Sequence, residues 1–359
     1  MVPPTPRVRL VPLVDEEPAS SGPVGADSLL SSRPAPRPMT HTVTVVGGAG
    51  TIGTTAAYTL CHSLPEVEVR LCDVDREAAA GHATDLRHAR CHASHALGSI
   101  GSVGHGGPTG DVKPVDPGPD ALDGTDCLLV TASVDRPSGS TGRGGRDRFW
   151  PANRDVADDV AGWLADADPV PVVAVTNPID RFLARLHAES GWPRSSFVGY
   201  SLSETARMAD AIARRVGADP ADVYCPILGE HGESMVPAFS RATVEGEPLK
   251  LPADERAALL DYTKSVPYEI ISQRGAEHSS RWVSGRGAAL IVASILEGGS
   301  DEAVCLSTPL DGEYGIGGVS LSVPVTLTDE GVGEILEWEL STAEREGLAA
   351  AAESVREKT

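Results

Sequence analysis

Two kinds of hydrophobic periodicity alternate along the chain from residue 41 onward. Short apolar runs that stop at glycine or aspartate, HTVTVVGG (41–48) and EVEVRLCDVD (66–75), indicate buried strands. Each run is followed by a segment with apolar residues at helical spacing, 51–64 and 76–90. Strands that alternate with helices build βαβ units, whose strands lie parallel in one sheet. The pattern therefore predicts an α/β fold with a doubly wound parallel sheet.

The same alternation continues to about residue 200 and then changes. The first part adds a Gly/Pro-rich loop at 97–124, strands at 126–133 and 170–178, and helices from Trp150 and from about residue 180. The second part has helices expected at 202–216, 253–273 and 283–297, strands at 222–228, 235–248 and onward to 328, and an Ala-rich terminal helix. We predict a nucleotide-binding domain at 41–200 and an α+β substrate domain at 201–359.

Residues 1–40 differ from the rest of the chain in composition. They are rich in proline and serine and hold no continuous apolar segment, so neither a signal peptide nor a membrane span is expected there. We predict a disordered leader that takes no part in the fold. Met39 stands directly before the first predicted strand and is a candidate translation start.

Acidic residues strongly outnumber basic residues. The 51 Asp and Glu against 30 Lys and Arg give a formal net charge of −21, which would repel nucleic acids and anionic membranes as partners. Only four of the basic residues are lysine. An acidic, lysine-poor composition is typical of proteins from salt-loving organisms, in which salt screens the repulsion. A GC-rich genome would also favour arginine over lysine, so both explanations stay open.

Six cysteines are scattered along the chain, at positions 61, 72, 91, 127, 225 and 305. They form no CxxC pair and no metal-ligand spacing, so we expect no metal site. Isolated cysteines of this kind act as small core residues in a reducing compartment. A cytoplasmic location is therefore predicted.

The turn after the first predicted strand carries the sequence GGAGTIG. Gly48, Gly50 and Gly53 form a GxGxxG motif between a strand and a helix, and Asp73 ends the next strand. Glycines allow backbone amides and the helix N-terminus to approach a pyrophosphate, while the carboxylate can accept hydrogen bonds from both ribose hydroxyls. The same carboxylate would repel a 2′-phosphate. The motif predicts a Rossmann-type domain that binds NAD rather than NADP; a tight turn without a ligand is the alternative.

A histidine stands at the end of another predicted strand, in ILGEHGES (227–234). Gly229 and Gly232 allow a sharp turn that presents His231, and the imidazole suits proton transfer near neutral pH. With the glycine-rich turn, this stretch resembles the lactate/malate dehydrogenase family over residues 42–357. In that family a histidine in a GEHGD-like turn donates a proton to the substrate carbonyl as hydride arrives from the nicotinamide. The resemblance implies that His231 is the general acid and base.

The resemblance also assigns residues that would bind substrate and cofactor. In LSETARMAD, Glu204 and Arg207 share one helix face, where Glu204 would hold the imidazole and Arg207 would grip the substrate carboxylate. The family has aspartate where this chain has Glu204. Asn177 in VTNPID would hydrogen-bond the substrate oxygen, and Ser280 in SRWVSGRG would lie near the bound acid. The further cofactor-binding residues are Thr51, Ile52, Thr131 and Asn153.

An Arg- and Gly-rich stretch, 131–153, resembles the mobile active-site loop of the family. Arg136 holds the position at which malate-specific members carry arginine and lactate-specific members carry glutamine, which favours a dicarboxylate. A second arginine would polarise the carbonyl. Counting back from Asn153 gives Arg146, but the loop is longer than usual and Arg143 is the alternative. The glycines fit a lid that closes over substrate, although a flexible, solvated loop would have the same composition.

We therefore predict an NAD-dependent dehydrogenase that interconverts malate and oxaloacetate. A reductase of lactate or another 2-keto acid is the alternative within the enzyme class, and a non-catalytic NAD-binding homologue is the alternative outside it. The expected partner is a small dicarboxylate or 2-keto acid. Because the family forms dimers and tetramers, a homo-oligomer is also expected.

If the acidic composition is an adaptation to salt, the melting temperature should rise between low and molar salt, because screening weakens repulsion among the 51 acids. Scanning calorimetry across that range measures the effect. A melting temperature that stays flat or falls would contradict the interpretation.

Overall fold

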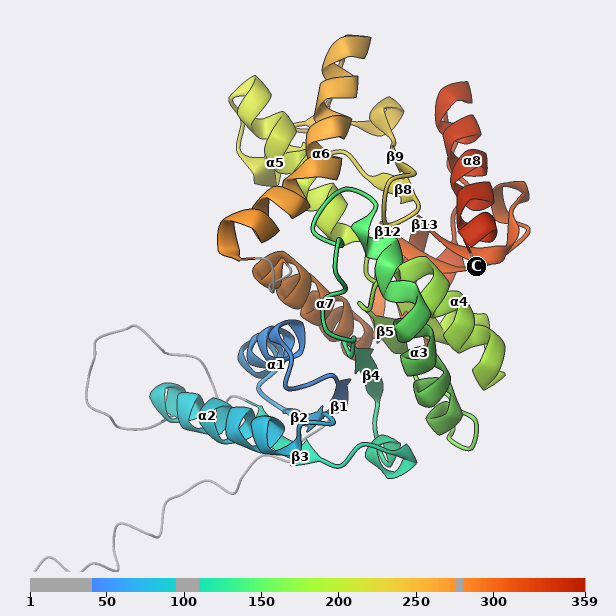
Figure 1. Ribbon diagram of the computed structural model, residues 1–359. Coiled ribbons are helices and arrows are strands. Elements are labelled where there is room, and N and C mark those ends of the chain that lie inside the picture. Colours follow the sequence, from blue (N-terminus) through green and yellow to red (C-terminus); the bar gives the residue numbers. More distant parts are fainter. Residues whose placement is uncertain (1–40, 95–109, 276–279, 359) are drawn as a thin grey trace, which may run out of the picture. The chain divides into compact units, whose positions relative to one another are not determined.

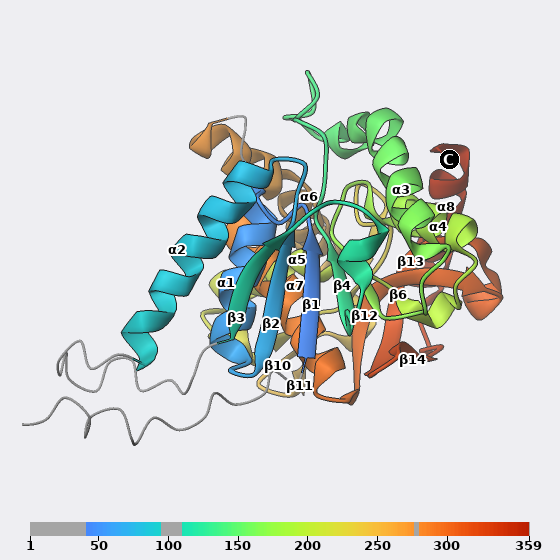
Figure 2. The ribbon, with the colours of Figure 1, turned by 90° about the horizontal axis from the view of Figure 1, so that it is seen from below.

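An 11-stranded mixed sheet passes through the part of the chain that the computed structural model describes, residues 41–94, 110–275 and 280–358 (Figure 1). Its parallel strands are β1 (His41–Val46), β2 (Val67–Cys72), β3 (Asp111–Val115), β4 (Cys127–Val130), β5 (Val172–Ala174) and β6 (Phe197–Gly199). They lie in the order β3-β2-β1-β4-β5-β6, and Figure 2 shows the first four side by side. The strand order reverses direction at β1, so the predicted doubly wound parallel sheet is confirmed.

Helices cover both faces of these parallel strands. On one face, α1 (Thr51–Ser63) packs against α7 (Arg281–Leu296); on the other, α3 (Trp150–Leu164) packs against α4 (Ile179–Ser190) (Figure 1). A further helix, α2 (Arg76–Ser94), packs on β2 and β3. The buried apolar side chains of the strands fall into two clusters that follow these faces. Strands buried on both sides carry nearly continuous Val and Leu runs, which is why their sequence pattern was clear.

Antiparallel strands extend the same sheet beyond β6. They are β8 (Ile227–Gly229), β9 (Met235–Pro237), β12 (Gly299–Asp311), β13 (Gly317–Thr328) and β14 (Gly331–Ile335). β12 pairs with both β6 and β13, so the sheet crosses the boundary predicted between residues 200 and 201 without a break. The described residues belong to one compact unit, Pro38–Thr359, and the division into two domains stays a prediction.

Among the described residues, three α-helices remain, and the remaining strands form a small three-stranded sheet. The helices are α5 (Leu202–Val216), α6 (Ala253–Arg274) and α8 (Thr342–Lys358); the strands are β7 (Val223–Tyr224), β10 (Thr243–Val244) and β11 (Glu247–Pro248). α5 begins and ends where the pattern predicted. The single strand predicted at 235–248 is wrong, because β9, β10 and β11 share that stretch with a 3-10 turn at Phe239–Arg241.

The loop predicted at 97–124 is also wrong in part. Residues 111–115 form β3, which pairs in parallel with β2 at the edge of the sheet. Lys113 and Pro114 hid this strand, because lysine and proline are typical of edge strands and weaken an apolar pattern. The predicted leader 1–40, with Met39, and residues 95–109 lie outside the described residues.

Two negative findings concern only the described residues. None of their helices is both long and apolar enough to cross a membrane. Nor do they contain a group of three or more His, Cys, Asp or Glu placed to hold a metal ion. Five cysteines are buried and free, as expected of small core residues: Cys61, Cys72, Cys127, Cys225 and Cys305.

The contact between α1 and α7 depends on the absence of one side chain. A Cβ placed on Gly285 of α7 would lie 2.6 Å from the Cβ of Thr55 on α1. Arg281, one turn earlier, donates a hydrogen bond of 3.0 Å from Nε to the hydroxyl of Thr55. The two helices therefore approach each other more closely than any larger residue at position 285 allows.

We expect Gly285→Ala to lower the free energy of unfolding by about 1–3 kcal/mol, because overpacking outweighs the gain in helix propensity. Denaturant titration measures the change. Gly162→Ala in α3 is a matched control, since a Cβ there meets nothing within 4 Å; it should stabilise by about 0.5–1 kcal/mol. Equal stabilisation by both changes would contradict the close packing of α1 and α7.

Candidate active site

The turn between β1 and α1 forms one wall of a cleft of about 540 Å³. Gly47 has a φ of 84°, and a Cβ there would lie 2.3 Å from the backbone nitrogen of Ala132. Only glycine fits this position. At the N-terminus of α1, the capping residue is Gly50, which has no side chain to cap the first helix amides. Those amides and the positive end of the helix dipole can therefore bind an anion.

Seven of the eight predicted cofactor-binding residues fall into two groups. Those that line the cleft are Gly50, Thr51, Ile52, Asp73 and Thr131. Gly48 and Gly53 instead allow close packing beneath it. A Cβ on Gly53 would lie 2.3 Å from the carbonyl oxygen of Gly47, and one on Gly48 would lie 2.8 Å from the Cα of Leu71.

The far end of the cleft combines a fixed carboxylate with apolar surface. Asp73 Oδ2 accepts a hydrogen bond of 2.9 Å from the amide of Ala49, so the carboxylate is held against the glycine-rich turn. Beside it, Val74 is 90% exposed and lines the cleft together with Pro117 and Trp163. A carboxylate suits ribose hydroxyls and an apolar surface suits an adenine ring, so this end of the cleft fits a dinucleotide.

Asn153 does not line the cleft. It is fully buried, its Nδ2 donates 2.6 Å to the carbonyl of Asn177, and its Oδ1 accepts 2.9 Å from the amide of Val134. The side chain thereby ties the segment after β4 to the turn after β5. This geometry favours a positioning role for Asn153 over direct contact with the cofactor.

A second cavity, of about 120 Å³, adjoins the cleft. Ile52, Thr131 and Arg136 line both spaces. Six of the seven predicted catalytic and substrate-binding residues also line the cavity: Arg136, Arg146, Asn177, Arg207, His231 and Ser280. The seventh, Glu204, lies behind His231. The structure therefore brings together residues that are as far apart as positions 136 and 280.

His231 and Glu204 form a buried pair at one side of this cavity. Their side chains are 4% and 2% exposed, and His231 Nδ1 lies 2.7 Å from Glu204 Oε2. The two atoms are close but are not aligned as a hydrogen bond in this conformation. Glu204 lies in the first turn of α5, where the helix dipole favours a negative charge. The pairing leaves His231 Nε2 as the nitrogen that can exchange a proton with a ligand.

The charges around the pair decide its protonation. Burial opposes ionisation of Glu204, but His231, Arg146 and Arg207 outweigh it and hold the pKa of this carboxyl well below its usual range. Burial lowers the pKa of His231, and the opposing effect of Glu204 does not cancel it. These two directions favour a carboxylate, compensated by Arg146 and Arg207, beside a neutral imidazole when no ligand is bound. An anion in the cavity would favour the imidazolium.

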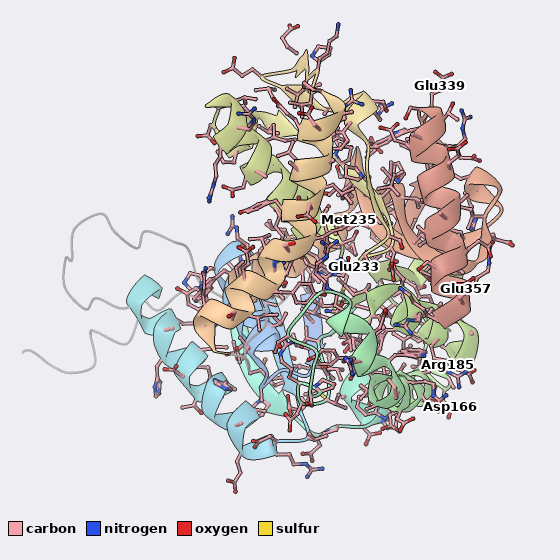
Figure 3. The ribbon with its side chains drawn as sticks, turned by 45° about the horizontal axis from the view of Figure 1, so that its top comes forward. Asp166, Arg185, Glu233, Met235, Glu339 and Glu357 are labelled. Atoms are coloured by element: carbon pink, nitrogen blue, oxygen red, sulfur yellow. The ribbon has the colours of Figure 1, made fainter. Side chains whose placement is uncertain are left out.

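The two alternative loop arginines point in different directions. Arg146, on the 3-10 helix η3 (Gly145–Phe149), donates 3.0 Å to Glu204 Oε1 and 3.1 Å to the carbonyl of His231. Arg143 is 44% exposed and pairs with Glu233 at 3.0 Å and with Asp261 of α6 at 2.7 Å. Figure 3 shows Glu233 beside α6. The geometry favours Arg146 as the arginine that reaches the cavity.

The other arginines and Asn177 complete the lining. Arg207 donates 3.3 Å to Ser280 Oγ and lies 3.4 Å from Glu204 Oε1. Arg136 stacks over the Phe149 ring at 5.4 Å, and burial lowers the pKa of its guanidinium. The Oδ1 atom of Asn177 is buried and has no hydrogen-bond partner among the described residues. A buried polar atom that has no hydrogen-bond partner in the protein can bind a polar ligand.

Two residues of the site were missed by sequence reasoning. Asp180 is 3% exposed and accepts hydrogen bonds from the amide of His231 at 2.7 Å and from Ser307 Oγ at 2.6 Å. Burial raises the pKa of Asp180 to about 7. Tyr268 of α6 lines the cavity. A signal for Asp180 existed, because it ends the VTNPID motif, whereas Tyr268 lies within a helix that carries no motif.

Comparisons with known proteins identify the family of this chain. Residues 41–199 match the family described as lactate/malate dehydrogenase, NAD binding domain, and residues 204–359 match its alpha/beta C-terminal domain. The malate dehydrogenase of Halobacterium salinarum is 32% identical over 319 residues, which cover 87% of this chain and 96% of that protein.

Solved structures of malate and lactate dehydrogenases share the fold of this chain. The malate dehydrogenase from Aeropyrum pernix superposes with a TM-score of 0.77 at 26% identity and covers 88% of this chain and 96% of its own. The lactate dehydrogenase from Cryptosporidium parvum, complexed with lactic acid and NAD, has a TM-score of 0.77 at 24% identity over 89% and 96%, and shows the shared fold.

A dinucleotide cleft that opens beside a histidine and its carboxylate partner is the arrangement of a nucleotide-dependent dehydrogenase. The two domain matches specify which one: the chain belongs to the lactate/malate dehydrogenase family, and its cofactor is NAD. The predictions of family, fold class and cofactor are confirmed.

Proposed function

We propose that the enzyme interconverts malate and oxaloacetate. The observation that carries this proposal is that two arginines, Arg136 and Arg207, line one cavity of about 120 Å³ that also contains His231. A dicarboxylate offers one carboxylate to each guanidinium, and charge-assisted pairs of this kind are strong and geometrically specific. The small volume suits a short acid. Relatives named malate dehydrogenase support the same substrate.

Each residue of the cavity would bind a different group of the substrate. Arg207, with Ser280 beside it, would bind the carboxylate next to the reacting carbon, and Arg136 would bind the distal one. The guanidinium of Arg146 and the side-chain N–H of Asn177 would donate hydrogen bonds to the carbonyl oxygen and stabilise its developing charge. When bound, NAD supplies or accepts the hydride. Closure of the loop that carries Arg136 and Arg146 would exclude water and strengthen each contact.

Proton transfer falls to His231 and Glu204. Nε2 of the imidazolium would donate a proton to the oxygen of oxaloacetate, and the neutral imidazole would take it from the hydroxyl of malate. A bound dianion raises the pKa of His231 and so charges the imidazole when oxaloacetate arrives. Glu204, 2.7 Å from Nδ1, stabilises that charge. The acid and base functions therefore follow from which substrate occupies the cavity.

The alternatives fit these contacts less well. Lactate or another monocarboxylate would offer no second carboxylate to the guanidinium of Arg136, whose charged form burial already disfavours. A non-catalytic NAD-binding homologue would not need a buried His231–Glu204 pair, which is expensive to desolvate.

We also propose a homo-oligomer located in the cytoplasm. Trp282 of α7 is 67% exposed and Tyr58 of α1 is 49% exposed, on two helices that pack together. Large exposed aromatic side chains favour a protein interface. The buried free cysteines are compatible with a reducing compartment. The net charge of −21 and the Halobacterium salinarum relative support adaptation to salt.

We expect Arg136→Gln to lower kcat/KM for oxaloacetate by at least about 30-fold and to raise activity on pyruvate, because the change removes a charge that only a dicarboxylate pairs. Steady-state NADH oxidation with both keto acids measures the ratio. An unchanged ratio would show that Arg136 does not read the distal carboxylate, and Arg143 would be tested next.

His231→Asn is the companion variant for the chemical step. It should abolish turnover of both keto acids while NADH still binds, since the cofactor cleft is not lined by His231. Near-normal turnover in this variant would rule out the proposed acid–base role.

The lowered pKa of His231 sets the pH dependence of both directions. Oxaloacetate reduction needs the imidazolium, so its kcat/KM should fall as pH rises through a pKa below the ordinary histidine value of about 6.5. Malate oxidation needs the neutral ring, so its kcat/KM should rise through that same pKa and then stay level. Profiles from pH 5 to 9 test this; an inflection above about 7 would contradict the effect of burial.

A further inference from the structure

The C-terminal end of α8 reaches the active-site loop and the histidine turn from outside the substrate cavity. Lys358 Nζ lies 2.9 Å from Glu230 Oε1 and 3.3 Å from Asp147 Oδ2. These two carboxylates belong to segments that are 83 positions apart in the sequence. In Figure 3 the end of α8 is marked by the neighbouring residue Glu357. One ammonium group therefore bridges two otherwise separate segments.

Each bridged carboxylate is adjacent in sequence to a residue of the proposed mechanism. Asp147 directly follows Arg146, and Glu230 directly precedes His231. Asp147 lies on η3, and Glu230 lies in the turn after β8. Because adjacent residues share a rigid peptide unit, fixing Asp147 and Glu230 restricts where Arg146 and His231 can lie.

A second cation completes this cluster. Arg181 of α4 donates 2.8 Å from Nη1 to the carbonyl of Lys358 and forms an ion pair with Asp147 through Nη2. Its guanidinium also lies over the Trp150 ring at 5.4 Å. Glu230 Oε2 accepts a hydrogen bond of 3.0 Å from the amide of Ser234. The cluster therefore balances two carboxylates with two cations.

The exposed fractions of the four side chains show which charges of the cluster are shielded from water. The side chains of Arg181 and Glu230 are 5% and 9% exposed, whereas those of Lys358 and Asp147 are 30% and 37% exposed. Without the ammonium group, the charges of Glu230 and Asp147 would repel each other, with Arg181 paired only to Asp147. Water and salt screen such repulsion only in part when one partner is buried. The expected response is a small separation of η3 from the histidine turn.

We propose that Lys358 is a positioning residue of the active site, which sets the separation between Arg146 and His231 by bridging Asp147 and Glu230. This inference rests on the proposed function, because it assigns Arg146 and His231 to the same reaction. A displacement of 1 Å at such residues is enough to slow a chemical step substantially. Substrate carboxylates pair with Arg136 and Arg207 instead, so the effect belongs to turnover and not to binding.

The variant Lys358→Met keeps the length of the side chain and removes its charge. We expect kcat for oxaloacetate to fall by about three- to tenfold, with KM for oxaloacetate and the NADH dissociation constant changed by less than about twofold. Lys358→Arg should restore most of the lost kcat. The effect should shrink in molar salt, because Lys358 is partly exposed.

Arg356→Met is the matched control on the same helix. Arg356 is 38% exposed, pairs with Glu353 and donates to the carbonyl of Gly317, away from η3 and the histidine turn. Its loss removes one positive charge from the end of α8 and should leave kcat unchanged. If Arg356→Met lowers kcat as much as Lys358→Met, or if Lys358→Met keeps the wild-type kcat, the proposal is overturned.

Hydrogen exchange supplies a readout that needs no substrate. Backbone amides at 143–149 and 230–234 should exchange faster in Lys358→Met than in the wild type, while those of the β1–α1 turn should not change. Unchanged exchange in both segments would overturn the positioning role. If the wild type does not reduce oxaloacetate but the exchange difference is present, the proposed substrate fails and the structural bridge stands.

Discussion

The ionised carboxylate of Glu204 is the constraint on which the arrangement of the active site depends. Its side chain is 2% exposed, and a buried charge without partners would cost several kcal/mol. Arg146 and Arg207 compensate it, and His231 Nδ1 covers its other oxygen. These partners come from η3, from α5 itself and from the turn after β8. These elements cannot move apart without uncovering the charge. Desolvation of one carboxylate thereby joins the loop, the histidine and the substrate-binding helix.

The length of the glutamate side chain decides what the carboxylate of Glu204 can contact. This length brings Oε2 within 2.7 Å of the imidazole and also brings Oε1 within 3.0 Å of Arg146. The contact between Glu204 Oε2 and His231 Nδ1 is, however, not aligned as a hydrogen bond. A bound anion would draw Arg146 toward the cavity and leave Glu204 more fully to the imidazole. Without a ligand, Glu204 therefore divides its two oxygens between the loop arginine and the imidazole.

The sequence was sufficient for features that depend on local order. The βαβ alternation, the glycine turn at 48–53 and the bounds of α5 follow from neighbouring residues, and the structure agrees with them. Loop counting could not separate Arg143 from Arg146, because spacing does not reveal which side chain turns inward. The edge strand β3 was not predicted, because Lys113 and Pro114 interrupt its apolar pattern. Contacts such as Asp180 with His231, or Lys358 with Asp147, join segments whose proximity only the folded sheet creates.

Arg143, the outward-facing arginine of the loop, would make opening of the loop depend on ionic strength. Arg143 joins the loop to Glu233 on the histidine turn and to Asp261 on α6, and all three side chains reach solvent. If the loop opens to release product, both of these ion pairs break together with the buried contacts of Arg146, and dissolved salt weakens the exposed pairs. If salt stabilises the acidic fold, the same salt would shorten the time that the loop stays closed. The fold and the loop would then respond to ionic strength in opposite directions, and turnover would be fastest at an intermediate salt concentration.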